Sequence, residues 1–265
     1  MRADSIAAGL GRWRARGALC YRAADETREG KRGMATYVLV HGAWGGGWSY
    51  QAIARGLRAA GHEVYAPTLT GLGEREHLAS PAIDLATHIR DVVNLIEYEG
   101  LSDIILCGHS YAGMVITGTA AAVGGRIRTL FYLDAFLPQD GQALWDIADE
   151  RSRRHYIDAQ RDRPGLVAHF SVAAGAPSDT PRPLSRQPLL TLIEPVRLTG
   201  EERKVANHTY VYATRDAPTA FTRFYETVRD DPAWRVVTVP TGHRVMADDP
   251  AGLIRLLLDE ADRPA

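Results

Sequence analysis

The sequence has few cysteines, no long apolar run and almost no net charge. Its two cysteines, Cys20 and Cys107, are too few for a disulfide-stapled scaffold, so we expect a reducing, cytoplasmic location. No apolar run approaches the roughly twenty residues needed to span a bilayer, and no signal-peptide core is present. The formal net charge of −1 gives no general attraction to nucleic acid or to anionic membranes. These absences favour a soluble globular protein that acts on a small molecule and leave its oligomeric state open.

Residues 1–33 differ in composition from the rest of the chain. They hold eight Arg or Lys and four Asp or Glu, a charge of +4, which leaves −5 for the remainder. No strand or helix periodicity appears in them, so we expect a disordered basic tail without a catalytic role. Initiation of translation at Met34 and a genuine basic arm are the two interpretations of this tail.

From Ala35 onward, short β-branched apolar runs alternate with segments of helical periodicity, which predicts a mostly parallel, doubly wound α/β sheet over residues 34–265. Asp84 and Asp249 stand where they could cap two of the helices. The predicted strands are 36–40, 63–67, 103–107, 129–133, 208–214 and 234–240, and the clearest helices are 48–60, 85–99 and 251–260.

The alternation breaks between Pro138 and about Pro195. A helix-like stretch at 143–160 precedes a proline-rich segment that still carries apolar side chains. We therefore predict a small helical cap, inserted at about 138–195, that packs over the functional site. The alternative is a disordered surface excursion.

Residues 108–113, with the sequence Gly-His-Ser-Tyr-Ala-Gly, follow a predicted strand and precede a small, apolar stretch. A serine at a sharp strand-to-helix turn needs small residues two places before and after it, and Gly108 and Ala112 occupy those places. The pattern is a nucleophile elbow in which Ala112 replaces the usual glycine and Gly113 follows one place later. We therefore predict that Ser110 is a nucleophile.

A second glycine-rich turn, residues 41–47, directly follows the strand 36–40. Such a turn lets backbone N–H groups point into a cavity, where they stabilise the oxyanion of acyl transfer. We predict that the N–H groups of Ala43 and Tyr111 form this oxyanion hole and that Trp44 and Trp48 line an apolar substrate pocket. An ordinary connection with packing aromatics is the alternative.

His243 follows the last predicted strand, which is where a base can reach a serine at an elbow. The acid that orients its imidazole should lie at another strand end. Asp216 follows the strand 208–214 and gives the chain order serine, aspartate, histidine, so we predict the triad Ser110–Asp216–His243. Asp134, which ends the strand 129–133, is the alternative acid.

These motifs together resemble those of α/β-hydrolases, and more narrowly of the small esterases related to plant salicylate- and jasmonate-ester hydrolases, hydroxynitrile lyases and bacterial pyrethroid hydrolases. In the resembling lyases a threonine stands at the place of Gly42 and a lysine at that of Arg244, so the first position follows the esterases and the second keeps a cation. The matching stretches are residues 40–44, 67–73, 108–113, 132–138 and 242–243.

The resemblance implies an α/β-hydrolase fold and a serine hydrolase that cleaves carboxylic esters of small, largely apolar molecules through an acyl-enzyme. No metal and no cofactor are expected, because no His, Cys or carboxylate cluster has the spacing of metal ligands. The alternatives are a non-hydrolytic use of the same triad, such as hydroxynitrile cleavage or rearrangement of a secondary metabolite, and a ligand-binding protein on a hydrolase fold.

Overall fold

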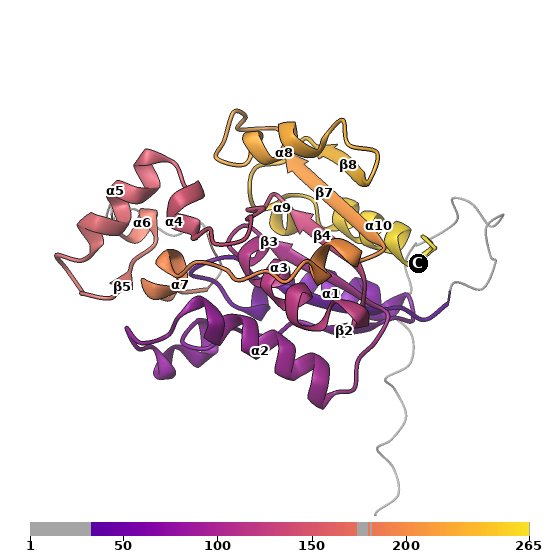
Figure 1. Ribbon diagram of the computed structural model, residues 1–265, viewed down its shortest axis with the longest axis horizontal. Helices are drawn as coiled ribbons and strands as arrows, with labels where there is room; N and C mark the ends of the chain where they lie inside the picture. The colour runs from indigo at the N-terminus through magenta and orange to yellow at the C-terminus, as the bar shows by residue number, and fades with distance from the viewer. Residues whose placement is uncertain (1–32, 174–179, 181, 265) are drawn as a thin grey trace, which may run out of the picture. The chain divides into compact units, whose positions relative to one another are not determined.

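Six parallel strands form the central sheet in the order β2-β1-β3-β4-β7-β8, so β1 lies second from one edge, with β2 on one side and the later strands added in turn on the other. This computed structural model describes residues 33–173, 180 and 182–264 (Figure 1). The predicted basic tail, with Cys20, lies outside the described residues apart from Gly33. The strands are β1 (Thr36–Val40), β2 (Glu63–Tyr65), β3 (Ile104–His109), β4 (Ile127–Leu133), β7 (Asn207–Ala213) and β8 (Trp234–Val239).

Helices cover both faces of the sheet, as the predicted doubly wound α/β architecture requires. Successive side chains of a strand point to opposite faces. Val38 and Val40 therefore join the core beneath α2 (Leu85–Tyr98), α3 (Ala112–Val123) and α8 (Thr222–Val228). Tyr37 and Leu39 join a second core beneath α1 (Gln51–Ala59) and α10 (Pro250–Ala261). The short helices are η1 (Gly47–Tyr50), η2 (Gly73–Leu78), η3 (Gly124–Arg126), η4 (Glu201–Lys204) and α9 (Val245–Asp248).

Aspartates begin the helices predicted from the sequence. Asp84 Oδ1 accepts a hydrogen bond from Thr87 N at the start of α2, and Asp249 Oδ1 accepts one from Gly252 N at the start of α10. The prediction of one helix over 143–160 is wrong, because the chain is extended at Ala148 and Asp149 caps a new helix there. The stretch therefore forms α4 (Leu144–Ile147) and α5 (Glu150–Ala159).

The chain from α4 to α7, which lies between β4 and β7, gathers at one end of the sheet, at the left of Figure 1. Besides α4 and α5 it contains α6 (Phe170–Ala173), α7 (Leu190–Ile193) and two short antiparallel strands, β5 (Leu166–Val167) and β6 (Gln187–Pro188). We call this segment the cap. Across the described ranges, no helix combines the length and the apolar character needed to cross a bilayer.

Candidate active site

Ser110 occupies the sharp turn between β3 and α3. Its φ of +55° lies in the left-handed region, which residues other than glycine rarely adopt. The turn is held by hydrogen bonds from Gly113 N (3.0 Å) and Phe136 N (3.2 Å) to the Ser110 carbonyl. A strained backbone fixed on several sides raises the serine side chain out of the strand end.

Close packing around the turn explains its small residues. A side chain at Gly108 would come within 2.8 Å of the Ala112 carbonyl oxygen, and one at Gly113 would overlap the backbone of Phe136. Ala112 is fully buried without such an overlap. The elbow therefore accommodates the methyl group of Ala112, whereas the backbone of Phe136 leaves no room for a Cβ at Gly113.

Ser110 and His243 line the same cavity, which has a volume of about 490 Å³. Ala43, Trp44 and Trp48, which come from the loop after β1 and from η1, line it too. Within the described part of the chain, neither Ser110 Oγ nor His243 Nε2 has a hydrogen-bond partner, so both groups remain available to a molecule in the cavity. The structure thus brings together these residues, which the sequence analysis selected.

The imidazole of His243 is bound to Asp134. Its Nδ1 lies 2.7 Å from Asp134 Oδ2, and Asp134 Oδ1 accepts a hydrogen bond from Ala213 N at 3.1 Å. Asp134 is fully buried directly after β4, and its φ of +42° turns the chain at the strand end. A buried carboxylate that accepts two hydrogen bonds holds the proton of the imidazole on Nδ1 and leaves Nε2 as the basic nitrogen.

The prediction that Asp216 makes this bond is wrong. Asp216 lies three residues beyond the end of β7 and is exposed, whereas Asp134 follows β4 immediately. The Asp216 carboxylate does lie near Gly242, because a Cβ added to that glycine would come within 3.0 Å of Oδ2. Asp216 is therefore a neighbour of the loop that carries His243, while Asp134 is the hydrogen-bond partner of the imidazole.

The loop after β1 is held by a buried neutral histidine. His41 Nδ1 donates to the Gly42 carbonyl (2.7 Å), and Nε2 accepts from Leu69 N (3.1 Å). Burial lowers the pKa of His41 to about 4, against a weaker opposing effect of the bond to Gly42. Among the described residues, the N–H groups of Ala43 and Tyr111 have no hydrogen-bond acceptor, which suits an oxyanion site.

The cap is fastened to this loop at Trp44. Trp44 N donates to Gln187 Oε1 (3.1 Å), its indole Nε1 donates to the Val167 carbonyl (2.9 Å), and Ser185 N donates to the Trp44 carbonyl (2.9 Å). His169, from the cap, packs edge-to-face on the Trp44 ring. These anchors are separated from Trp44 by more than a hundred residues, so no local sequence signal could reveal them.

Two rings pack against the His243 imidazole, and the sequence analysis identified neither contact. Phe221, just before α8, stacks on it with 4.7 Å between ring centroids and an angle of 9° between the planes. His109 lies with its centroid 4.5 Å away, and its Nε2 donates to the His243 carbonyl (2.8 Å). Burial, reinforced by the proximity of His243, holds the pKa of His109 well below its ordinary value, so His109 is neutral.

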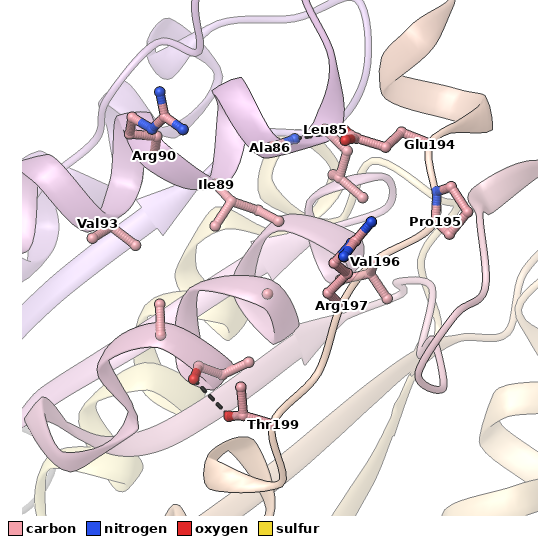
Figure 2. Close-up of a pocket in the computed structure, with 13 residues that line it drawn as sticks. Leu85, Ala86, Ile89, Arg90, Val93, Glu194, Pro195, Val196, Arg197 and Thr199 are labelled. Carbon is pink, nitrogen blue, oxygen red and sulfur yellow. Dashed lines mark hydrogen bonds between the residues drawn. The ribbon is translucent and has the colours of Figure 1, made fainter.

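A second hollow lies away from these residues, between α2, α3 and the chain at 194–199 (Figure 2). It has a volume of about 380 Å³. Glu194 closes one end by accepting a hydrogen bond from Ala86 N, and Thr199 donates to the Ala121 carbonyl. This second hollow is lined by none of the predicted catalytic residues. The cavity beside Ser110 is therefore the candidate active site.

Comparison with known proteins gives one consistent picture. A family model described as "Alpha/beta hydrolase family" matches residues 37–256. The carbendazim hydrolyzing esterase of Nocardioides sp. is 40% identical over 238 residues, which cover 84% of this chain and 98% of that protein. Salicylic acid-binding protein 2 of Nicotiana tabacum is 33% identical over 112 residues, 42% of each chain. The crystal structure of a pyrethroid hydrolase from Sphingobium faniae superposes with a TM-score of 0.70 at 25% identity, covering 88% of this chain and 99% of that one.

Proposed function

The chain belongs to the α/β-hydrolase family, and from this premise we propose that it cleaves carboxylic esters of small, largely apolar molecules through an acyl-enzyme on Ser110. The observation that carries the proposal is the position of His243. Its Nδ1 is bound to a buried carboxylate, and its imidazole lines the same cavity as a serine held at an elbow.

In the proposed reaction, His243 Nε2 takes the proton of Ser110 Oγ as the oxygen attacks the ester carbonyl. Asp134 stabilises the imidazolium that forms and keeps the ring in its orientation. The imidazolium then protonates the departing alcohol. A water molecule, deprotonated by the same nitrogen, attacks the acyl group, and Ser110 regains its proton.

The negative charge on the carbonyl oxygen needs donors that are already in place. We assign the N–H groups of Ala43 and Tyr111 to this role, because among the described residues neither has another acceptor. The side chain of Tyr111 is buried and its hydroxyl bonds to His88 Nδ1 at 2.8 Å, so the proposed role concerns its backbone N–H alone.

Packing at Gly42 favours ester hydrolysis over the lyase alternative. A Cβ at this position would lie 2.9 Å from His109 Nδ1 and 3.1 Å from Ser110 Cβ. A threonine, which the resembling lyases have here, would require the elbow to shift. Trp44 and Trp48 give the cavity an apolar lining that suits the apolar part of an ester. The likeness to the carbendazim hydrolyzing esterase makes carbendazim a candidate substrate alongside simple esters.

The test combines covalent labelling with turnover. A fluorophosphonate should add one label per chain, and short p-nitrophenyl esters should give a burst of p-nitrophenol as the acyl-enzyme accumulates. Ser110→Ala should lose both labelling and turnover while keeping its melting temperature. Persistent labelling of this variant would show that the nucleophile lies elsewhere. Release of cyanide from mandelonitrile without ester turnover would favour the lyase alternative.

A further inference from the structure

We propose that Phe221 is a positioning residue for the reaction, whose ring holds the His243 imidazole in the plane where Nδ1 meets Asp134 and Nε2 faces Ser110. The inference rests on the proposed function, because it takes His243 as the base. It adds a residue that belongs to neither the triad nor the oxyanion hole.

The geometry that carries the proposal is a nearly parallel stack. The planes of Phe221 and His243 differ by 9°, with 4.7 Å between the ring centroids. His109 approaches the same imidazole to 4.5 Å, and among the described ring pairs it does not contact Phe221. The imidazole is therefore packed against two rings and bound at one edge to Asp134.

Without these rings, His243 would have one directional restraint, the hydrogen bond at Nδ1. The His243 side chain is 39% exposed, so burial alone does not hold it. A hydrogen bond to one nitrogen still allows the ring to tilt about that bond, and the tilt carries Nε2 away from the serine. Because catalytic groups must be held within about 0.5 Å and 10–20° of their working geometry, a flat wall against the ring face is an effective restraint.

Phe221 is itself held firmly. It is 8% exposed, its backbone N–H donates to Thr219 Oγ1, and its ring packs edge-to-face on Phe136 with centroids 5.0 Å apart. Phe136 in turn lies against the elbow, since its N–H donates to the Ser110 carbonyl. Phe221 therefore links the His243 imidazole, through Phe136, to the turn that carries Ser110.

The chain offers a matched control in Phe224. It lies within α8, the helix that Phe221 precedes, is 5% exposed, and packs edge-to-face on the same Phe136 ring with centroids 5.8 Å apart. Its ring does not contact His243 among the described ring pairs. Phe221→Leu and Phe224→Leu thus both remove a buried ring from one cluster, but only the first removes the wall beside the imidazole.

The experiment measures kcat and KM for a p-nitrophenyl ester and the rate of fluorophosphonate labelling in both leucine variants and in Phe221→Tyr. We expect Phe221→Leu to lower kcat and the labelling rate about tenfold with KM within twofold, because misplacement of a catalytic group acts on the chemical step. Phe224→Leu should stay within twofold of the parent in both rates. Phe221→Tyr, which keeps the aromatic face, should restore most of the loss.

Equal rates in Phe221→Leu and Phe224→Leu, or a tyrosine variant as slow as the leucine variant, would overturn the proposal. If Phe221→Leu does not fold, as judged by circular dichroism, Phe221→Met takes its place with the same expectations. Labelling is independent of the choice of ester, so it separates two failures. A parent protein that is not labelled overturns the proposed function and this inference together, whereas labelling that is equally fast in the parent and in Phe221→Leu overturns this inference alone.

Discussion

Acid should destabilise the fold because it contains buried histidines that stay neutral. His41 is the clearest case, since burial lowers its pKa to about 4 while both ring nitrogens bond to the backbone. In the unfolded chain the same side chain has its ordinary pKa of about 6.5. The unfolded state therefore binds more protons than the folded state between these two values, and the stability that His41 contributes is lost as the pH falls below about 6.5.

The magnitude follows from the two pKa values. Between pH 7 and pH 5, His41 alone should lower the free energy of unfolding by about 2 kcal/mol. His88 and His109 act in the same direction, because burial lowers the pKa of each. Asp84, whose pKa is lowered chiefly by the hydrogen bond from the Thr87 side chain, loses its contribution only below its ordinary value of 3.8, outside this interval. A typical total stability is about 5–15 kcal/mol, so the histidine effect is measurable.

Urea denaturation followed by tryptophan fluorescence at pH 5, 6, 7 and 8 tests this reasoning. His41→Gln replaces the ring by a side chain of different shape, so it should be less stable than the parent at pH 7. Because glutamine does not titrate, the variant should lose about 2 kcal/mol less than the parent between pH 7 and pH 5. His77→Gln, at an exposed position in η2, is the control and should keep the pH dependence of the parent. Parallel pH curves for the parent and His41→Gln would refute the buried, neutral state of His41.

Four further substitutions, in two matched pairs, test the acid and the elbow. Asp134→Asn should lower kcat by up to ~10⁴-fold at pH 8, because the amide favours the wrong tautomer of His243 and removes the charge opposite the imidazolium. Asp216→Asn should change kcat less than threefold with an unchanged melt, and the reverse ranking in two folded variants would return the role of the acid to Asp216. Gly113→Ala should destabilise the fold by about 3 kcal/mol, because the methyl group would overlap the backbone of Phe136. The control Gly125→Ala, where nothing lies within 4 Å, should melt within two degrees of the parent, and equal melts of the two variants would contradict this account.

The architecture could be predicted because strands and helices have different periods of apolar residues, and β1, α2 and α10 formed close to their expected bounds. Ser110 and His243 could be selected because each lies in a loop directly after a strand, with a recognisable neighbourhood. The placement of the cap was indicated by the break in alternation, whereas its β5–β6 pair was not, since two-residue strands have no pattern of their own.

The acid could not be identified because Asp134 and Asp216 look alike in sequence. Each follows an apolar run, and each precedes His243 in the chain. They differ in backbone conformation, because Asp134 has a φ of +42° at the end of its strand. The identity of the residue as aspartate does not predict that conformation. Phe221 escaped notice for a related reason. Its partner His243 is distant in sequence, and an aromatic residue before a short helix is ordinary.

The attachment of Trp44 to the cap has a consequence for chimaeras between this enzyme and its relatives. Three hydrogen bonds join the residue beside Ala43 to Val167, Ser185 and Gln187. The cap, which contributes His169 and Leu184 to the lining of the cavity, thus also supports the loop after β1, whose Ala43 N–H we assign to the oxyanion hole. A chimaera that receives the cap of a relative must therefore also receive that relative's loop after β1. Without the matching loop, its kcat should fall for every substrate, and its substrate specificity should not change.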